Sequence, residues 1–187
     1  MSMLSYELFG TDVYHLIACF CVYSIGGWFV ESVYMSICEK KITNRGFGAS
    51  PFCPIYGVGA TVGYYVLCRF ENQPLILYLV GAIGATIFEF LVAILMKKLF
   101  NQVWWDYNDK PLNYKGILCA ESTLAWGLYA IIVIRFLHKQ VIYLIDLVPR
   151  DTGIIVCAVI ICIYAIDFFI HLYKVVKVNK EKRVQEA

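Results

Sequence analysis

The sequence predicts an all-α fold: a polytopic membrane bundle of about five transmembrane helices in one integral-membrane domain, residues 1–187. Of the 187 residues, 60% are hydrophobic and 16% are charged, and the mean hydropathy is +0.67. Soluble domains are typically about 45–50% apolar and about 25% charged. The apolar residues form runs long enough to cross a bilayer as helices. The sequence shows no alternating segments of about ten residues, which would be typical of a membrane β-barrel. Helices are also favoured because backbone polar groups in lipid must bond within their own segment.

The first apolar run is expected to stay as a helix. The residues before it contain no Lys or Arg and include Glu7 and Asp12, whereas a signal peptide begins with basic residues. The second run is short, but Pro54 at its start is well placed because the first helical position needs no N–H. The last three runs are clear. We expect spans near 13–38, 54–70, 75–96, 116–137 and 153–173.

Basic residues predict the orientation. With the N-terminus outside, twelve Lys and Arg lie on the inner side and four on the outer side, as the positive-inside rule requires. Residues 139–148 alternate apolar and polar side chains at near-helical spacing, which predicts a short helix at the outer interface. Residues 174–187 are then a cytoplasmic basic tail, which fixes the topology and contacts anionic lipid.

Composition excludes several function classes. The net charge of +2 predicts no nucleic-acid partner. The eight cysteines form no CxxC pair and no spacing with His that fits zinc, and most lie in apolar runs, where Cys packs as a small hydrophobe. We therefore expect no metal site, no disulfide framework and no cofactor.

Two segments resemble each other. "GGWFVESVYMSICEKK" and "GATIFEFLVAILMKK" each carry a Gly, then Glu31 or Glu89, then a basic pair. Each is followed by an inner loop that ends in a similar phrase, "NRGFGASPFC" or "NYKGILC". The similarity is weak and is equally open to chance. As a true repeat it would divide the bundle into two parallel helical hairpins plus one helix.

Four acidic residues are predicted at one depth in the membrane. Each lies six to nine residues from a Lys near the cytoplasmic boundary, which places its carboxylate roughly 9–14 Å inside. They are Glu31, Glu89, Glu121 and Asp167. Embedded carboxylates are costly unless paired, wetted or protonated. They indicate a polar, inward-open cavity with Arg45 as counter-ion. The alternative is that each acid reaches the interface or packs against a Tyr or Trp donor.

The second inner loop, "NQVWWDYNDKPLNYKG", adds polar residues to the same side. Its Trp and Tyr residues fit an interfacial aromatic belt. The Asp and Asn residues between them, with Pro111, are typical of turns. Both unusual loops face the cytoplasm, where the acids are expected.

The sequence contains no recognisable catalytic motif. Neither Cys53 nor Ser122, which follows Glu121, has a histidine at a known activating spacing. There is no P-loop and no HExxH motif. Whether the protein is an enzyme is left open.

An ordered set of motifs, "GWFVESVY", "NRGFGASPFCPIYGVGA" and "WWDYNDKPLNYKGILCAESTLAWG", resembles a bacterial family labelled putative ABC-transporter permease, or ABC-transporter type IV (CmpB-like). The resemblance covers about residues 24–128. Two positions depart from the family pattern, which has a basic residue at Ile117 and an apolar one at Glu121. The second departure suggests that Glu121 is peculiar to this chain, which reduces the argument from four acids to three. The matching positions are Trp28, Glu31, Asn44, Arg45, Gly46, Phe47, Pro51, Cys53, Pro54, Ile55, Tyr56, Gly57, Trp105, Asp106, Tyr107, Asn113, Gly116, Trp126 and Gly127.

The resemblance implies a multi-pass protein of a bacterial plasma membrane that moves a solute with a partner ATPase. This chain has no ATP-binding motif, so the ATPase would be a separate cytoplasmic protein, docked on an inner loop such as 97–115. Five helices are few for a permease, so a homodimer would be needed to enclose a pathway.

We therefore predict a small transporter or permease subunit with a polar site in the cytoplasmic half. One alternative is an intramembrane enzyme or binding protein for a lipid headgroup or lipid-linked substrate. Another is a membrane accessory or assembly protein. Arg45 is expected to point into the bundle, toward Glu31 or Glu89. The candidate substrate-binding residues are Glu31, Asn44, Arg45, Tyr56, Glu89, Trp105, Asp106, Tyr107, Asn113 and Glu121.

Overall fold

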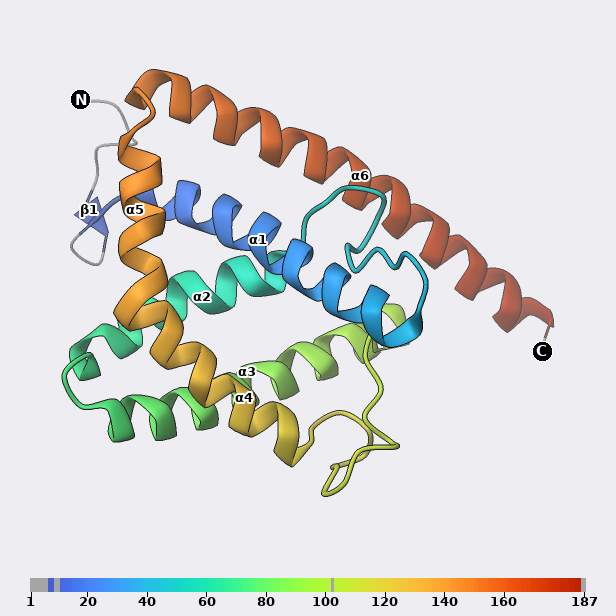
Figure 1. Cartoon of the computed structure of the whole chain (residues 1–187). Helices are drawn as coiled ribbons and strands as arrows, with labels where there is room; N and C mark the ends of the chain where they lie inside the picture. Colours follow the sequence, from blue (N-terminus) through green and yellow to red (C-terminus); the bar gives the residue numbers. More distant parts are fainter. Residues whose placement is uncertain (1–6, 9–10, 102, 186–187) are drawn as a thin grey trace. The chain divides into compact units, whose positions relative to one another are not determined.

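The structure is a computed structural model that describes residues 7–8, 11–101 and 103–185 (Figure 1). The described residues are mainly helical, so the predicted all-α membrane bundle is confirmed. A 3-10 turn at Cys68–Phe70 follows α2, a π-helical turn at Val133–Leu137 follows α4, and the two-residue strands β1 and β2 pair antiparallel. The elements are β1 Glu7–Leu8, β2 Thr11–Asp12, α1 Val13–Glu39, α2 Pro54–Leu67, α3 Pro74–Phe100, α4 Ala120–Ile132, α5 His138–Asp146 and α6 Arg150–Gln185.

The chain forms two compact units. The first unit comprises Met1–Gly57 and Ile145–Ala187, and the second comprises Val58–Leu144. Helices α1 and α6 contact each other in the first unit, and α3 and α4 do so in the second. Each unit is described by itself below.

Local chemistry sets the ends of the long helices. The Asp12 side chain accepts a hydrogen bond from the His15 N–H at 2.9 Å and so caps α1. Pro74 occupies the first turn of α3, where no N–H is needed. Helices α1 and α3 end at Lys40 and Asn101, whose φ angles of 53° and 57° are left-handed and stop the helical ladder.

Among the described residues, four helices are long and apolar enough to cross a membrane. They are Val13–Glu39, Pro74–Phe100, Ala120–Asp146 and Arg150–Val178. The run predicted as a fifth span, 54–70, forms the 14-residue helix α2 and the 3-10 turn after it. Fourteen residues rise about 21 Å, less than the roughly 30 Å of a bilayer core. The 3-10 turn that follows lengthens the helical run to Phe70, so 54–70 stays a predicted fifth span, shorter than the other four.

Three other boundaries differ from those predicted. The span predicted from 116 begins at Ala120, because an isolated bridge between Tyr114 and Leu118 keeps the preceding residues in the loop. The short interfacial helix predicted at 139–148 is the end of one continuous helical stretch from α4 to α5, with the π-helical turn between them. Pro149 is the first residue after that turn that would interrupt a helix. The predicted basic tail extends α6 as helix to Gln185.

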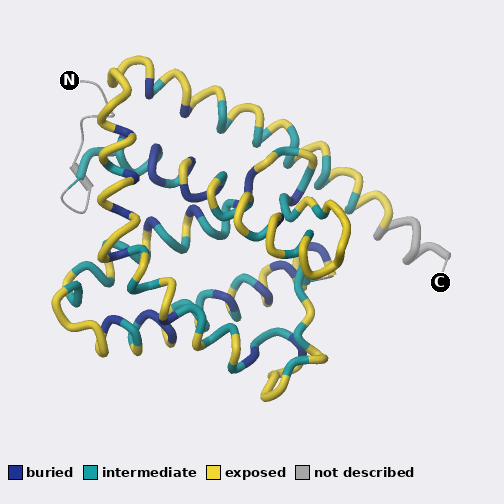
Figure 2. The backbone as a smooth tube through the Cα atoms, viewed as in Figure 1, coloured by how far each residue is buried: buried dark blue, intermediate teal, exposed yellow. Residues whose placement is uncertain are grey.

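Apolar side chains cover the outside of the long helices. Residues Ile155, Ile163 and Ile170 of α6 are all exposed, and Figure 2 shows the same along much of that helix. A soluble protein rarely leaves such long apolar faces open to water. We conclude that these faces contact lipid and that the chain is a multi-pass membrane protein.

In the first unit, α1 and α6 run in the same direction (Figure 1). A methyl group in place of the Gly153 hydrogen, near the start of α6, would collide with the Tyr14 hydroxyl at the start of α1. A polar network joins the same two ends. His15 Nδ1 lies 2.9 Å from Asp12 Oδ1, His15 Nε2 lies 2.9 Å from Asp146 Oδ1, and Arg150 donates to Asp12 Oδ2 at 2.6 Å.

This network predicts an acid-dependent loss of stability. Burial raises the pKa of Asp12, but hydrogen bonds from Arg150 and His15 outweigh it and lower the pKa from 3.8 to about 2. Because the folded pKa is depressed, the stabilisation is complete above the ordinary pKa and is lost as pH falls through the folded value. We expect it to be on the order of 2 kcal/mol and to disappear between about pH 4 and pH 2. An Arg150→Gln variant should show a flatter dependence of the melting temperature on pH in that window, and an unchanged slope would contradict the assignment.

In the second unit, α3 and α4 form an antiparallel hairpin (Figure 1). Small residues bring them close: a methyl group at Gly81 would collide with Ala130, and one at Gly127 would meet the Tyr78 ring. Leu77 is fully buried in this unit. The hairpin places the loop between α3 and α4, residues 101–119, next to the polar ends of both helices.

Candidate functional site

The first unit contains an ion pair between a membrane-spanning helix and the loop that follows it. Glu31 of α1 accepts hydrogen bonds at Oε1 from Arg45 Nε and Nη2, both at 2.9 Å. Its second oxygen, Oε2, accepts from the Tyr56 hydroxyl at the start of α2. The side chains of Arg45 and Glu31 are 20% and 22% exposed, so neither is fully enclosed by the chain. We call Glu31, Arg45 and Tyr56 the Glu31 cluster. Arg45 was expected to point toward Glu31 or Glu89, and it pairs with Glu31.

The backbone of the loop after α1 holds Arg45 in place. Asn44 Oδ1 accepts from the Trp28 indole N–H at 2.6 Å and from the Gly46 N–H at 2.9 Å. The Arg45 N–H donates to Ser32 Oγ at 3.1 Å. A side chain at position 46 would come within 2.5 Å of a backbone oxygen, so glycine is needed there. Asn44 therefore positions the arginine and is not itself part of the ion pair.

Asp167 of α6 anchors the same loop. Its carboxylate accepts hydrogen bonds from the N–H groups of Ala49 and Ser50, at 3.1 and 2.9 Å, and from the Ser50 hydroxyl at 2.6 Å. The Phe47 ring packs against His171 with ring centroids 4.8 Å apart. This acid, predicted at cavity depth, thus serves to fasten the loop to α6.

An Asp167→Asn variant should loosen the loop. The amide keeps one acceptor oxygen but loses the charge. We therefore expect the free energy of opening of this segment to fall by about 1–2 kcal/mol. Hydrogen–deuterium exchange of peptides covering residues 43–53 measures the change. An Asp151→Asn variant, at an exposed position in the first turn of α6, is the control and should exchange like wild type. Equal protection in the two variants would show that Asp167 is not the anchor.

The thiol at the end of this loop is not an activated nucleophile. Cys53 is buried, and burial raises its pKa to about 12. The Ser122 hydroxyl donates to the carbonyl of Cys119 at 3.0 Å, which is a local helix-start contact. All eight cysteines are free. Among the residues that the structure describes, no group of His, Cys, Asp and Glu is arranged to hold a metal ion.

The second unit contains a more deeply buried carboxylate. Glu89 of α3 is 5% exposed. Its oxygens accept from the Tyr107 hydroxyl and from the Trp126 indole N–H, each at 3.0 Å. We call these three residues the Glu89 cluster. Glu89 thus shows the arrangement that the sequence left open as the alternative, in which an embedded acid packs against Tyr and Trp donors.

Three predicted site residues shape the second inner loop. The Trp105 indole donates to the carbonyl of Ile117 at 2.8 Å. Asp106 accepts from the backbone and side-chain nitrogens of Asn108, at 2.9 and 2.6 Å, as in an Asx turn. Asn113 donates to two loop carbonyls and accepts from the Gly116 N–H. These contacts order the loop and hold Tyr107, which reaches Glu89.

Glu121 lies apart from the Glu89 cluster. It forms an ion pair with Lys110 at 2.9 Å, and the side chains are 43% exposed for Lys110 and 58% for Glu121. A pair this exposed contributes little to stability. It sits at the surface, in the first turn of α4.

Two hydrogen-bonding residues, a donor and an acceptor, were assigned no specific contact from the sequence. Trp126 supplies an indole N–H to Glu89, and Ser32 supplies the acceptor for the Arg45 backbone. The sequence signal for this contact is the "AWG" motif, which places Trp126 in an apolar helix. Its indole N–H is one of the few donors there that could bond to an embedded carboxylate. The structure brings together Glu31, Arg45 and Tyr56 in one unit and Glu89 and Tyr107 in the other.

Comparison with known proteins yields one family. No curated protein and no solved structure matches the chain significantly. The sequence model of the family described as "Putative ABC-transporter type IV" matches residues 18–172, which include both clusters and all four long helices for most of their length. The chain therefore belongs to the family described as putative ABC-transporter type IV.

Proposed function

We propose that the chain is a small permease subunit of a transporter, with the Glu31 cluster as its polar site. The observation that carries the proposal is the ion pair between Glu31, inside a membrane-spanning helix, and Arg45 of the loop that follows, whose side chains are both about one-fifth exposed. Charged residues inside spans are costly and mark ion or substrate routes when water or a ligand can reach them. Membership of an ABC-transporter family supports transport as the activity.

In this proposal Glu31 and Arg45 bind a polar solute by exchanging partners. A solute anion competes with Glu31 for the guanidinium, which can hold two oxygens side by side. Glu31, still bonded to Tyr56, then accepts from a donor on the solute or takes up a proton. Asn44 and Asp167 hold the loop that carries Arg45 in position.

Energy would come from a partner ATPase, because the sequence has no nucleotide-binding motif. The hydrogen-bonded loop 101–119 is the candidate docking element for it. The proposed orientation places the N-terminus outside, the C-terminus in the cytoplasm of a bacterium, and two copies around one pathway.

The test compares matched Glu→Gln substitutions in a strain that lacks the protein. The strain is complemented with wild type, with Glu31→Gln or with Glu121→Gln, and the metabolites of cells and medium are profiled by mass spectrometry. Wild type and Glu121→Gln should restore the same solute distribution, and Glu31→Gln should not. If Glu31→Gln restores it fully at equal expression, the site assignment is wrong.

Two alternatives give different outcomes in the same strains. Arg45 would also suit a lipid phosphate, so a lipid-headgroup enzyme would change a lipid class and leave soluble metabolites unchanged. For an assembly protein, Glu31→Gln would be silent, while substitutions in the 101–119 loop would abolish function. Co-purification of an ATPase whose turnover depends on the chain would favour the permease.

A further inference from the structure

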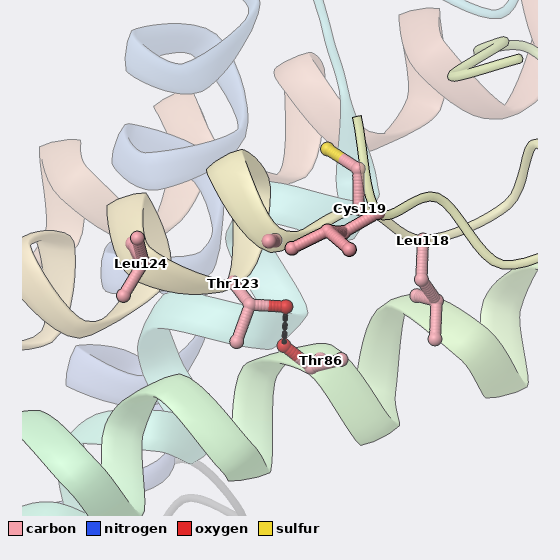
Figure 3. Close-up of a pocket in the computed structure, with 7 residues that line it drawn as sticks. Thr86, Leu118, Cys119, Thr123 and Leu124 are labelled. Carbon is pink, nitrogen blue, oxygen red and sulfur yellow. Dashed lines mark hydrogen bonds between the residues drawn. The ribbon is translucent and has the colours of Figure 1, made fainter. Parts of the chain in front are cut away.

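An apolar pocket opens beside the second inner loop, within the second unit. Its volume is about 320 Å³, at the lower end of the 300–1,000 Å³ typical of ligand sites. Figure 3 shows α3 and the start of α4 forming its walls. Its lining includes Thr86, Leu112, Leu118, Ala120, Thr123 and Leu124.

The polar atoms in this pocket are already bonded to protein. The Thr86 hydroxyl donates to Thr123 Oγ1 at 3.0 Å, the contact drawn as a dashed line in Figure 3. Cys119, which also lines the pocket, accepts the Ser122 N–H at its sulfur at 3.3 Å. Water is favoured only in cavities that offer it several polar partners. The remaining surface therefore suits a hydrocarbon chain.

One side of the pocket is formed by a leucine that the loop holds open to solvent. Leu112 is 85% exposed, and its φ of 53° is a left-handed conformation that leucine rarely adopts. The amide of Asn113 fixes the turn by donating to the carbonyls of Asn108 and Lys110, at 3.1 and 2.9 Å. The loop thus maintains an exposed apolar side chain at the edge of an apolar pocket. A hydrocarbon seated in the pocket would cover it.

The position of the pocket indicates the source of that hydrocarbon. Thr86 lies in the span Pro74–Phe100, and Thr123 and Leu124 lie in the span Ala120–Asp146. The pocket therefore lies between two membrane-spanning helices, near their ends at the second inner loop. The Lys110–Glu121 ion pair flanks it, one partner two residues before Leu112 and the other directly after Ala120. An exposed cation beside an exposed anion complements a headgroup that carries both a phosphate and an ammonium.

We propose that this pocket binds one acyl chain of a zwitterionic phospholipid of the phosphatidylethanolamine class. The lipid phosphate joins the Lys110–Glu121 ion pair at the Lys110 ammonium, and the lipid ammonium joins it at the Glu121 carboxylate, so that four alternating charges meet. A purely anionic headgroup would be repelled by the Glu121 carboxylate. This lipid site is separate from the Glu31 cluster and does not depend on its function.

The test measures lipid retention by the full-length protein in detergent. Native mass spectrometry counts bound lipids after the protein is mixed with phosphatidylethanolamine, phosphatidylglycerol or soluble phosphoethanolamine. Ala120→Phe fills the pocket, and Ala158→Phe, at an exposed position on α6, is the matched control. Wild type and Ala158→Phe should retain one phosphatidylethanolamine per chain. Ala120→Phe should bind it about tenfold more weakly, the change that roughly 1.4 kcal/mol would produce.

A surface variant keeps the test decisive should Ala120→Phe fail to fold. Glu121→Lys removes the partner of the lipid ammonium and should shift the preference from phosphatidylethanolamine to phosphatidylglycerol. Equal retention by Ala120→Phe and wild type would overturn the proposal. So would an unchanged preference in Glu121→Lys, or displacement of the lipid by phosphoethanolamine at equal concentration, which would show that the acyl chain contributes nothing.

Discussion

Replacing Glu89 by alanine is expected to cause the largest loss of stability of any single substitution in the two clusters. The Tyr107 hydroxyl and the Trp126 indole N–H would both lose their acceptor at a site where the acid is 5% exposed. Each buried donor left without a partner costs about 1–3 kcal/mol. For two donors we therefore expect the free energy of unfolding to fall by about 2–6 kcal/mol. Thermal or denaturant unfolding of the detergent-solubilised protein measures this.

Matched variants separate the lost hydrogen bonds from the cavity that alanine leaves. Glu89→Gln keeps the shape and one acceptor oxygen, so its loss should be smaller than that of Glu89→Ala. Tyr107→Phe and Trp126→Phe each remove one donor and should cost about 1 kcal/mol in wild type. Either change should cost less when Glu89 is already alanine, because the donor is then unsatisfied. Strict additivity would mean that these contacts are not coupled.

Replacing Arg45 by methionine is expected to produce the second-largest effect. Methionine keeps an unbranched apolar side chain but leaves the Glu31 carboxylate without its guanidinium. Breaking a buried ion pair by removing one partner costs about 3–5 kcal/mol. The two side chains are about one-fifth exposed, so part of their interaction is screened. We therefore expect a loss of about 2 kcal/mol in the free energy of unfolding. The melting temperature should fall accordingly.

The double variant tests whether the loss arises from the unpaired charge. Adding Glu31→Gln to Arg45→Met removes that charge, and most of the lost stability should return. The exposed pair serves as control: Lys110→Met should change the unfolding free energy by no more than about 1 kcal/mol. If Lys110→Met lowers the unfolding free energy as much as Arg45→Met does, then burial is not the reason why the Glu31–Arg45 pair is stabilising.

The sequence anticipated the ion pair for a physical reason. A guanidinium flanked by apolar helices needs a carboxylate, and Glu31 was one of two within reach. It did not separate Glu31 from Asp167, because both are acids at a similar distance from basic residues. The structure assigns them differently: Glu31 bonds to a cation, whereas Asp167 bonds to backbone N–H groups. Only the path of the loop decides which donors each acid meets.

The second inner loop shows where sequence reasoning is weakest. Asp106 and Asn113 were predicted as substrate-binding residues because polar groups clustered there. The structure uses both to close turns, through contacts that Asp and Asn make locally in many loops. The same residue types serve turns and ligand sites, so composition alone cannot separate the two. Tyr107 could be assigned only once the loop was seen to bring its hydroxyl to Glu89.

The sequence by itself determined that this chain is a helical membrane protein, since apolar run length and sparse charge fix that outcome whatever the packing. It also placed Glu31 and Glu89 inside spans. Tertiary structure decided that α2 ends at Leu67 in a 3-10 turn, that α4 continues into α5, and which donor each carboxylate receives. Those features depend on how long each helix continues and which side chains meet across helices. Hydropathy predicts neither of these features. It reports how strongly each segment prefers lipid, and it contains no information on which side chains that segment will meet.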